Sequence, residues 1–182
     1  MPTWSSSELS PWLAALKKGE IVAAPAEGVY GYCADPFNSR ALEKILEIKQ
    51  RSLKKGLIVL ISKLSQLDQL SPGSLPEECR SAVSAYWPGA VTIILPALSS
   101  LPSILTGGLS TVAVRFPSSP YMLEYLEAHG GPLCSTSLNL SGEPPAIVPK
   151  QISGGIPSLT LSEPLSGSVS RIFNPVAHSW LR

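Results

Sequence analysis

Residues 38–61 read NSRALEKILEIKQRSLKKGLIVLI, and this stretch contains the features that decide the fold class. Asn38 can cap a helix. The apolar residues that follow lie near one face of that helix: Leu42, Ile45, Leu46 and Ile48. A basic segment comes next, and residues 57–61 then form a continuous apolar run that is long enough for a buried strand. The order of helix, charged loop and buried strand predicts a sheet covered by helices.

The sequence on either side of this stretch alternates in the same way between helical and strand patterns. We expect helices over residues 7–18, 74–86 and 119–130, and strands over residues 20–24, 91–95, 111–116 and 133–136. Ser74 and Glu77 have the spacing of a capping box, and Gly130 can close the third of these helices. We therefore predict an α/β or α+β fold, a mixed sheet with flanking helices, in one domain over residues 1–182.

The composition excludes several classes of protein. Hydrophobic residues make up 44% of the 182 residues and charged residues only 15%, which excludes a disordered chain. The formal net charge of +1 excludes an overall basic coat for nucleic acid. A run of 18 apolar residues and the pattern of a secretory signal are both missing, so we expect no membrane association. Three scattered cysteines without a CxxC pair indicate neither disulfides nor a metal site, and we expect a cytoplasmic protein.

The segment PAEGVYG, residues 25–31, follows the first predicted strand. Pro25 fixes one backbone dihedral, and the two glycines permit close approaches that a Cβ would prevent. Glu27 and Tyr30 would then present a carboxylate and a phenol at the edge of a cleft. An ordinary turn between a strand and a loop explains the same pattern equally well.

Positive charge is concentrated in the stretch quoted first. Residues 40–63 contain seven basic and two acidic side chains, a local charge of +5. Lys49 and Arg51 could hold a polyphosphate together, one as a point charge and the other as a planar fork. The alternative is that these cations only complement the carboxyl end of the helix that precedes them.

Two other polar patterns lie within or after predicted strands. Arg115 interrupts the apolar run of residues 111–116, so it is either half of an internal ion pair or a fixed guanidinium for a carboxylate or phosphate. Residues 135–142, STSLNLSG, offer four hydroxyls and one amide to an oxygen-rich ligand. Without an adjacent His–Asp pair this is not the pattern of a serine hydrolase, and neither GxxxxGK[ST] nor GxGxxG occurs.

Five segments occur in the order seen in the YrdC family: PAEGVYGYCADP, KQRSLKKGLIVLI, WPGAVTIILP, LTGGLSTVAVRF and PLCSTSLNLSG. The chain resembles the short, single-domain members of that family from about residue 8 to residue 174. The resemblance implies a twisted mixed sheet with an open, positively lined cavity. It also implies a nucleotidyltransferase that makes threonylcarbamoyl-adenylate and pyrophosphate from L-threonine, bicarbonate and ATP. This product serves the modification of tRNAs that read ANN codons.

The resemblance implies a set of site residues as well. The paired KxR and SxN motifs give the residues expected to act in catalysis: Lys49, Arg51, Ser137 and Asn139. The same four are expected to bind ATP together with Lys55, Thr92 and Ser170. The residues expected on the threonine side are Ala26, Tyr30, Arg115, Ser135 and Ser141. ATP is implied as a substrate whose phosphates hold Mg²⁺, without a metal site on the protein, and the implied partners are the proteins that transfer the threonylcarbamoyl group to tRNA.

The sequence departs from the family pattern at three places and leaves other functions open. Ala26 stands where threonine is usual, Tyr32-Cys33 where a small residue is common, and Ser52 where proline is frequent. These changes are compatible with a divergent relative that binds threonine more weakly. A double-stranded RNA-binding or ribosome-assembly protein would also use a basic cavity. A carbamoyl-adenylate module of the hydrogenase-maturation type normally belongs to a much larger chain.

Overall fold

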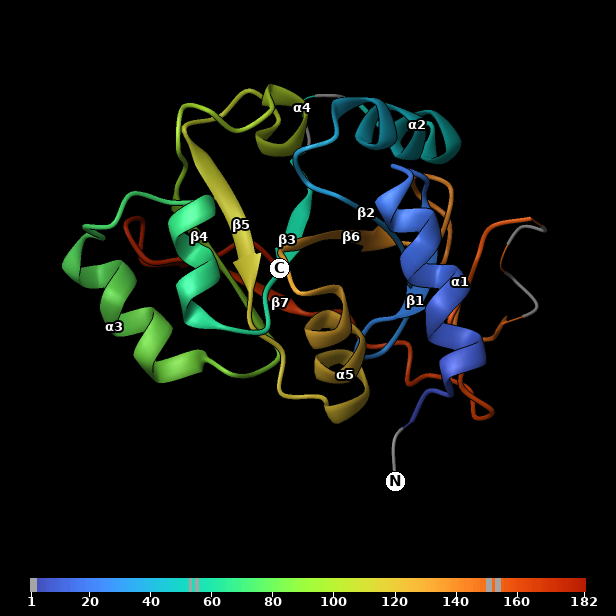
Figure 1. The fold of residues 1–182 in the computed structure, drawn as a ribbon. Coiled ribbons are helices and arrows are strands. Elements are labelled where there is room, and N and C mark those ends of the chain that lie inside the picture. Colours follow the sequence, from blue (N-terminus) through green and yellow to red (C-terminus); the bar gives the residue numbers. More distant parts are fainter. Residues whose placement is uncertain (1–2, 53, 55, 150–151, 153–154) are drawn as a thin grey trace.

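The strands of this protein form one mixed sheet. The structure is a computed structural model that describes residues 3–52, 54, 56–149, 152 and 155–182. The strands within these residues are β1 (Val22–Pro25), β2 (Tyr30–Ala34), β3 (Ile58–Leu60), β4 (Val91–Pro96), β5 (Thr111–Arg115), β6 (Leu133–Ser137), β7 (Arg171–Asn174) and β8 (Ser179–Trp180). Their order in the sheet is β1-β2-β6-β3-β5-β4-β7-β8 (Figure 1). β3 pairs with β5 and β4 with β7 in parallel, and the other neighbours are antiparallel.

The helices begin and end largely where the sequence predicts. They are α1 (Ser6–Lys17), α2 (Ser39–Lys49), α3 (Glu77–Tyr86), α4 (Ser103–Thr106) and α5 (Pro120–His129), with a 3-10 helix η1 (Leu64–Gln69). Asn38 caps α2 as predicted, because its Oδ1 accepts a hydrogen bond from the N–H of Ala41 at 3.3 Å. Gly130 ends α5 with φ of 83°, a left-handed conformation that favours glycine.

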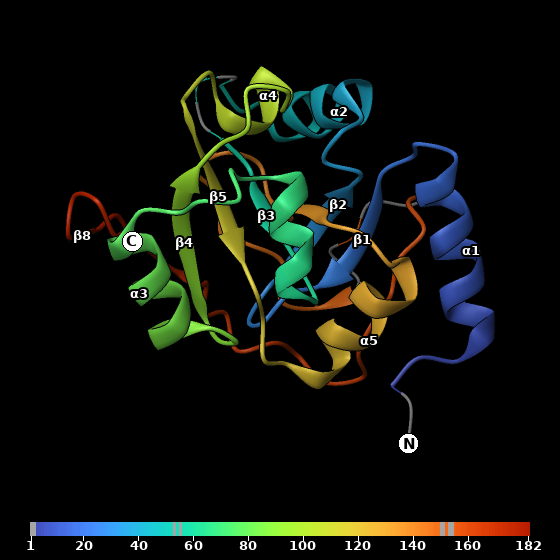
Figure 2. The same cartoon turned by 60° about the vertical axis from the view of Figure 1, so that its left-hand side comes forward.

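Two hydrophobic clusters cover opposite faces of the sheet. In β3, Val59 belongs to a cluster that includes Leu42 of α2, whereas Leu60 belongs to a cluster that includes Trp12 of α1 and Tyr125 of α5. Successive residues of a strand point to opposite faces, so α2 and α1 pack on different sides of the sheet. Figure 2 shows α1 beside α5, and α3 beside β4. The predicted mixed sheet with flanking helices is confirmed.

Several local predictions are wrong. Ser74 does not form a capping box, because α3 begins at Glu77 and Pro76 occupies the capping position. Tyr30 and Gly31 belong to β2 and are not part of a turn, and their strand is buried along its whole length. Sequence reasoning also missed β2, β7, β8, α4 and η1, which are short elements.

Candidate functional site

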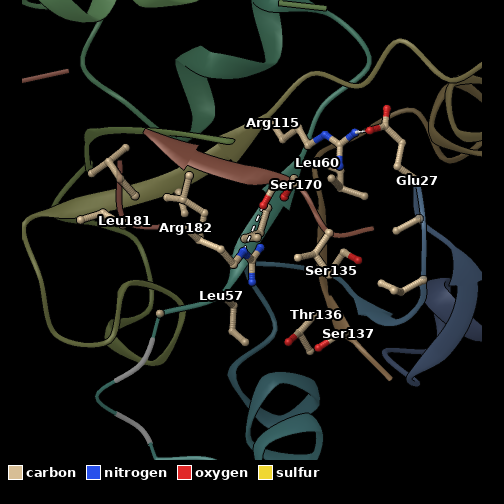
Figure 3. Close-up of a pocket in the computed structure, with 18 of the residues that line it drawn as sticks. Glu27, Leu57, Leu60, Arg115, Ser135, Thr136, Ser137, Ser170, Leu181 and Arg182 are labelled. Carbon is tan, nitrogen blue, oxygen red and sulfur yellow. Dashed lines mark hydrogen bonds and ion pairs between the residues drawn. The ribbon is translucent and has the colours of Figure 1, made fainter. Parts of the chain in front are cut away.

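A cavity of about 230 Å³ lies on the sheet face that α1 and α5 partly cover (Figure 3). A cavity that holds a single ordered water has a volume of roughly 10–15 Å³, so this cavity has room for a ligand of many atoms. Alternate residues of three neighbouring strands form its floor: Ile58 and Leu60 of β3, Ala113 and Arg115 of β5, and Ser135 and Ser137 of β6. Alternate residues share a face of the sheet, so the strand register brings these groups together.

Loop residues and the last part of the described chain form the walls of the cavity. Residues 26–29 lie next to residues 168–170, and both segments line it. The N–H of Gly167 donates to the carbonyl of Gly28 at 2.7 Å. A Cβ at position 28 would overlap the backbone of Ser168. Glycine at position 28 therefore lets the two segments approach closely.

Three arginines from distant parts of the chain line the cavity: Arg51 after α2, Arg115 at the end of β5, and Arg182 after β8. Arg51 donates to the carbonyl of Gly56 at 2.9 Å and to the hydroxyl of Thr136 at 3.3 Å. Its buried Nε has no hydrogen-bond partner among the described residues. Burial lowers the pKa of Arg182, and the charges of Arg51 and Arg115 lower it further. An anion in the cavity would relieve this repulsion between like charges.

Arg115 is paired inside the protein and also faces the cavity. Its Nη2 forms an ion pair with Oε2 of Glu27, and its Nε donates to the carbonyl of Gly89 at 3.0 Å (Figure 3 shows the ion pair). The internal ion pair, one of the two alternatives from the sequence, is confirmed. A guanidinium has five N–H donors, so these contacts leave donors for a ligand.

Lys49 lies behind the cavity, since its side chain is buried and it is not among the lining residues. Its Nζ donates to the carbonyl of Ser137, to the carbonyl of Asn139 at 3.0 Å and to Oδ1 of Asn139 at 2.7 Å. Burial first, and then the charge of Arg51, lower the pKa of Lys49 to about 8. The expected contact between Lys49 and phosphate stays a prediction.

The SxN loop, residues 137–141, is tied to itself and to α2. Oγ of Ser137 donates to Oδ1 of Asn139 at 2.7 Å, and Nδ2 of Asn139 donates to the carbonyl of Glu143 at 2.6 Å. The N–H of Ser141 donates to the carbonyl of Lys49 at 2.9 Å. Ser137 lines the cavity, whereas Asn139 and Ser141 do not. Asn139 therefore connects Ser137 to Lys49.

The structure brings some of the other predicted residues to the cavity. Ala26, Ser135 and Ser170 line it. Thr92 is buried below the lining, with its hydroxyl 3.0 Å from that of Ser170. Lys55 lies outside the described residues.

Tyr30 is not at the edge of a cleft, which corrects the expectation from the sequence. Its position in β2 buries the side chain completely, and its hydroxyl accepts a hydrogen bond from the N–H of Leu161 at 3.0 Å. Burial of this ring raises the pKa of the Tyr30 phenol.

Sequence reasoning missed Arg182, Thr136 and Ser168 among the lining residues. Thr136 lies in the hydroxyl-rich segment that the sequence singled out, so its signal was available. No local pattern marks Arg182, because β4 and β7 must pair before the residue reaches the cavity.

The polar groups that line the cavity within the described residues are arginines, one glutamate and hydroxyls, and none is His, Cys or Lys. No three His, Cys, Asp or Glu side chains of these residues gather into a metal site. In the described part of the chain, every helix is too short or too polar to cross a membrane. The cavity is therefore suited to hold and orient an anionic ligand through cations and hydroxyl donors.

Comparison with known proteins finds one matching family and relatives that have the same name. The family model described as telomere recombination, which covers Sua5, YciO and YrdC proteins, matches residues 14–160. The threonylcarbamoyl-AMP synthase of Enterobacter sp. (strain 638) is 41% identical over 138 residues, which are 75% of this chain and 73% of that protein. The synthase of Stenotrophomonas maltophilia (strain K279a) is 43% identical over 135 residues, 74% of this chain and 73% of that protein.

Solved structures show the same fold. P. abyssi Sua5 complexed with L-threonine matches with a TM-score of 0.82 and 30% identity, over 91% of this chain and 50% of that one. This chain thus spans about half the length of that protein. E. coli YciO has a TM-score of 0.81 at 21% identity, over 95% of this chain and 86% of that one. With a family model that matches residues 14–160 and relatives of about 40% identity, the chain belongs to the Sua5/YciO/YrdC family.

Proposed function

We propose that this protein is a threonylcarbamoyl-AMP synthase, which joins L-threonine, bicarbonate or CO₂, and ATP to give L-threonylcarbamoyl-adenylate and pyrophosphate. The observation that carries the proposal is the convergence of Arg51, Arg115 and Arg182 on one cavity whose other polar lining is mainly hydroxyl. The relatives at 41% and 43% identity have this name.

The reaction needs positioned cations more than a nucleophilic side chain. The amine nitrogen of threonine bonds to the carbon of CO₂ and releases a proton to solvent, which gives a carbamate, and one carbamate oxygen attacks the α-phosphorus of ATP. The bond between the α-phosphorus and its bridging oxygen breaks, and pyrophosphate leaves. If bicarbonate is the carbon source, one water is released as well. The attacking and leaving groups are both anionic, so fixed guanidinium groups stabilise the charge in the transition state.

We assign Arg51 and Arg182 to the phosphates and Arg115 to the carboxylate of threonine. The pairing of Arg115 with Glu27, in the loop that the family resemblance places on the threonine side, supports this division. The hydroxyl of Ser137 lines the cavity and donates its proton to Asn139, so it is an acceptor for the adenylate, and Lys49 would support it from behind through the SxN loop. Mg²⁺ enters with ATP as the counter-ion of its phosphates and is part of the substrate.

We further propose that the product passes to proteins that transfer the threonylcarbamoyl group to tRNA, because a mixed anhydride hydrolyses when it is released into water. The local charge of +5 over residues 40–63 favours RNA binding, but the positions of these side chains in the structure support RNA binding less. Lys49 is buried, and Arg51 faces the cavity. On the exposed face of α2, Arg40 and Lys44 alternate with acidic residues.

One experiment tests the proposed activity directly. The protein is incubated with L-threonine, bicarbonate, MgATP and pyrophosphatase, and mass spectrometry follows threonylcarbamoyl-adenylate and its AMP fragment. We expect product with the wild type and at least about a hundredfold less with Arg51→Ala, the loss typical of a missing transition-state donor. Arg80→Ala is the matched control, because Arg80 is exposed and pairs with Glu77 on α3. A folded wild type that makes no threonine-dependent product would refute the proposal.

A further inference from the structure

Pro25 ends β1 and residues 26–29 form the loop that follows, and the carbonyl of each of these five residues accepts a hydrogen bond. The carbonyl of Val29 accepts from the N–H of Ala26 at 2.9 Å, and that of Gly28 accepts from the N–H of Gly167 at 2.7 Å. The other three carbonyls accept from tyrosine hydroxyls of α5. Such complete pairing fixes the path of the loop beside the cavity.

Two tyrosines one turn apart on α5 provide these three bonds. Oη of Tyr121 lies 3.0 Å from the carbonyl oxygen of Ala26 and 3.0 Å from that of Glu27. Oη of Tyr125 lies 3.2 Å from the carbonyl oxygen of Pro25. A phenol has one proton, so Tyr121 shares it between two acceptors and holds the two peptide groups on either side of the Glu27 Cα.

The backbone of Glu27 decides where its carboxylate lies. That carboxylate pairs with Arg115, whose Nε is bonded to the carbonyl of Gly89. Burial raises the pKa of Tyr121, so the phenol keeps its proton near neutral pH and stays a donor. A continuous set of contacts thus runs from α5 through the loop to the guanidinium in the cavity.

We propose that Tyr121 is a positioning residue for the amino-acid side of the cavity. Its hydroxyl holds the loop so that Glu27 keeps the Arg115 guanidinium aimed at the carboxylate of the bound amino acid. The inference rests on the proposed function. It predicts an effect on threonine alone, because the hydrogen bonds of Arg51 and Arg182 go to segments other than this loop.

The variant Tyr121→Phe removes only the hydroxyl. We expect the KM for L-threonine to rise about three- to tenfold, the effect of one lost hydrogen bond, with kcat and the KM for ATP within twofold of wild type. Tyr125→Phe is the matched control, because its hydroxyl binds Pro25 in β1, which does not line the cavity. This control should keep the wild-type KM for threonine.

The outcomes separate the two proposals. If the wild type makes no adenylate, the proposed function fails. If the wild type is active and Tyr121→Phe keeps its KM for threonine, or loses affinity for both substrates equally, the positioning role of Tyr121 is refuted.

A double variant tests the route through Glu27. Glu27→Gln breaks the ion pair with Arg115, so we expect Tyr121→Phe to change the KM for threonine less than about twofold in that background. A full three- to tenfold effect in the Glu27→Gln background would show that Tyr121 does not act through Glu27.

Discussion

Ala26 lines the cavity at the residue where the family resemblance leads us to expect threonine. Its N–H and its carbonyl are both hydrogen-bonded, to Val29 and Tyr121, so a larger side chain at this position keeps the same backbone path. We predict that Ala26→Thr raises the affinity for L-threonine several-fold and leaves the affinity for ATP unchanged. One added hydrogen bond contributes about 0.5–1.5 kcal/mol, and this free energy corresponds to a several-fold gain in the affinity for threonine.

Calorimetric titration of both proteins with threonine in the presence of ATP checks this, and titration with ATP is the internal control. Equal threonine affinities would mean that the new hydroxyl has no partner in the complex. A weaker affinity in Ala26→Thr would mean that the pocket has been rebuilt around the alanine.

Lys49 makes the free energy of unfolding depend on pH, and the sign of this dependence follows from its lowered pKa. Burial and the charge of Arg51 lower its pKa in the folded protein from 10.5 to about 8. Between these values the unfolded chain keeps a proton that the folded protein has lost, so the free energy of unfolding rises with pH in this window. Well below pH 8 both states hold the proton, and Lys49 adds no pH dependence.

Lys49→Met cannot titrate and lacks this rise. Relative to that variant, we predict that the wild type gains up to about 3 kcal/mol of stability as the pH is raised through the window. Urea unfolding of both proteins at a series of pH values measures the difference. A difference that stays constant with pH would contradict the lowered pKa of Lys49.

At the scale of elements, the end of β6 and the SxN loop work as one unit. Oδ1 of Asn139 accepts from Lys49 and from Ser137, the residue of this loop that lines the cavity. We predict that Asn139→Ala frees Ser137 and lowers the rate of adenylate formation about 10²–10³-fold, the effect of losing one positioned hydrogen bond in the transition state. Single-turnover measurements with saturating substrates give this rate.

Asn174→Ala is the control for this prediction. Asn174 ends β7, and its Oδ1 accepts from the N–H of Ala177 in a turn, so it is also an asparagine that closes a strand. It should keep the wild-type rate. Wild-type turnover in Asn139→Ala would mean that the SxN motif has no catalytic part in this protein.

The strands that the sequence predicts are those with an apolar run of their own. The apolar runs of β3 and β5 predict buried strands without knowledge of their partners. β2 reads YGYCA, with a glycine and no β-branched residue, and its pairing of Gly31 with Ser137 joins residues far apart in the chain. β7 and β8 are short and depend on β4, so neither they nor Arg182 could be predicted from local patterns.

At the candidate site, too, local patterns could not predict everything. The KxR spacing predicts that Lys49 and Arg51 hold the phosphates together, and this contact stays a prediction, although both cations contact the hydroxyl-rich segment. It could not predict that they point to different places. Gln50, between them, ends α2 with φ of 49°, a left-handed conformation that turns the chain sharply. Lys49 consequently lies behind the SxN loop, while Arg51 faces the cavity.

At the scale of the whole molecule, the fold brings together charges that the sequence keeps apart. Arg51, Arg115 and Arg182 meet at one cavity, and the first two lower the pKa of the third. An anion that binds only the folded protein relieves this repulsion. It stabilises the folded state by about 2.7 kcal/mol at a concentration of one hundred times its Kd.

We predict that ATP or tripolyphosphate at such a concentration raises the Tm by roughly 5–10 °C, since 1 kcal/mol shifts the Tm of a domain of this size by about 2–4 °C. Arg182→Met removes one charge from the cluster at the expense of one hydrogen bond to the carbonyl of Ser170. Its ligand-free Tm should therefore stay close to that of the wild type, while most of the ligand-induced shift is lost. Scanning calorimetry at fixed ionic strength measures both quantities, and Arg80→Met, which changes an exposed side chain of α3, should keep the full shift. An undiminished shift in Arg182→Met would remove Arg182 from the phosphate site, and a ligand-free Tm that falls by several degrees would make its role structural.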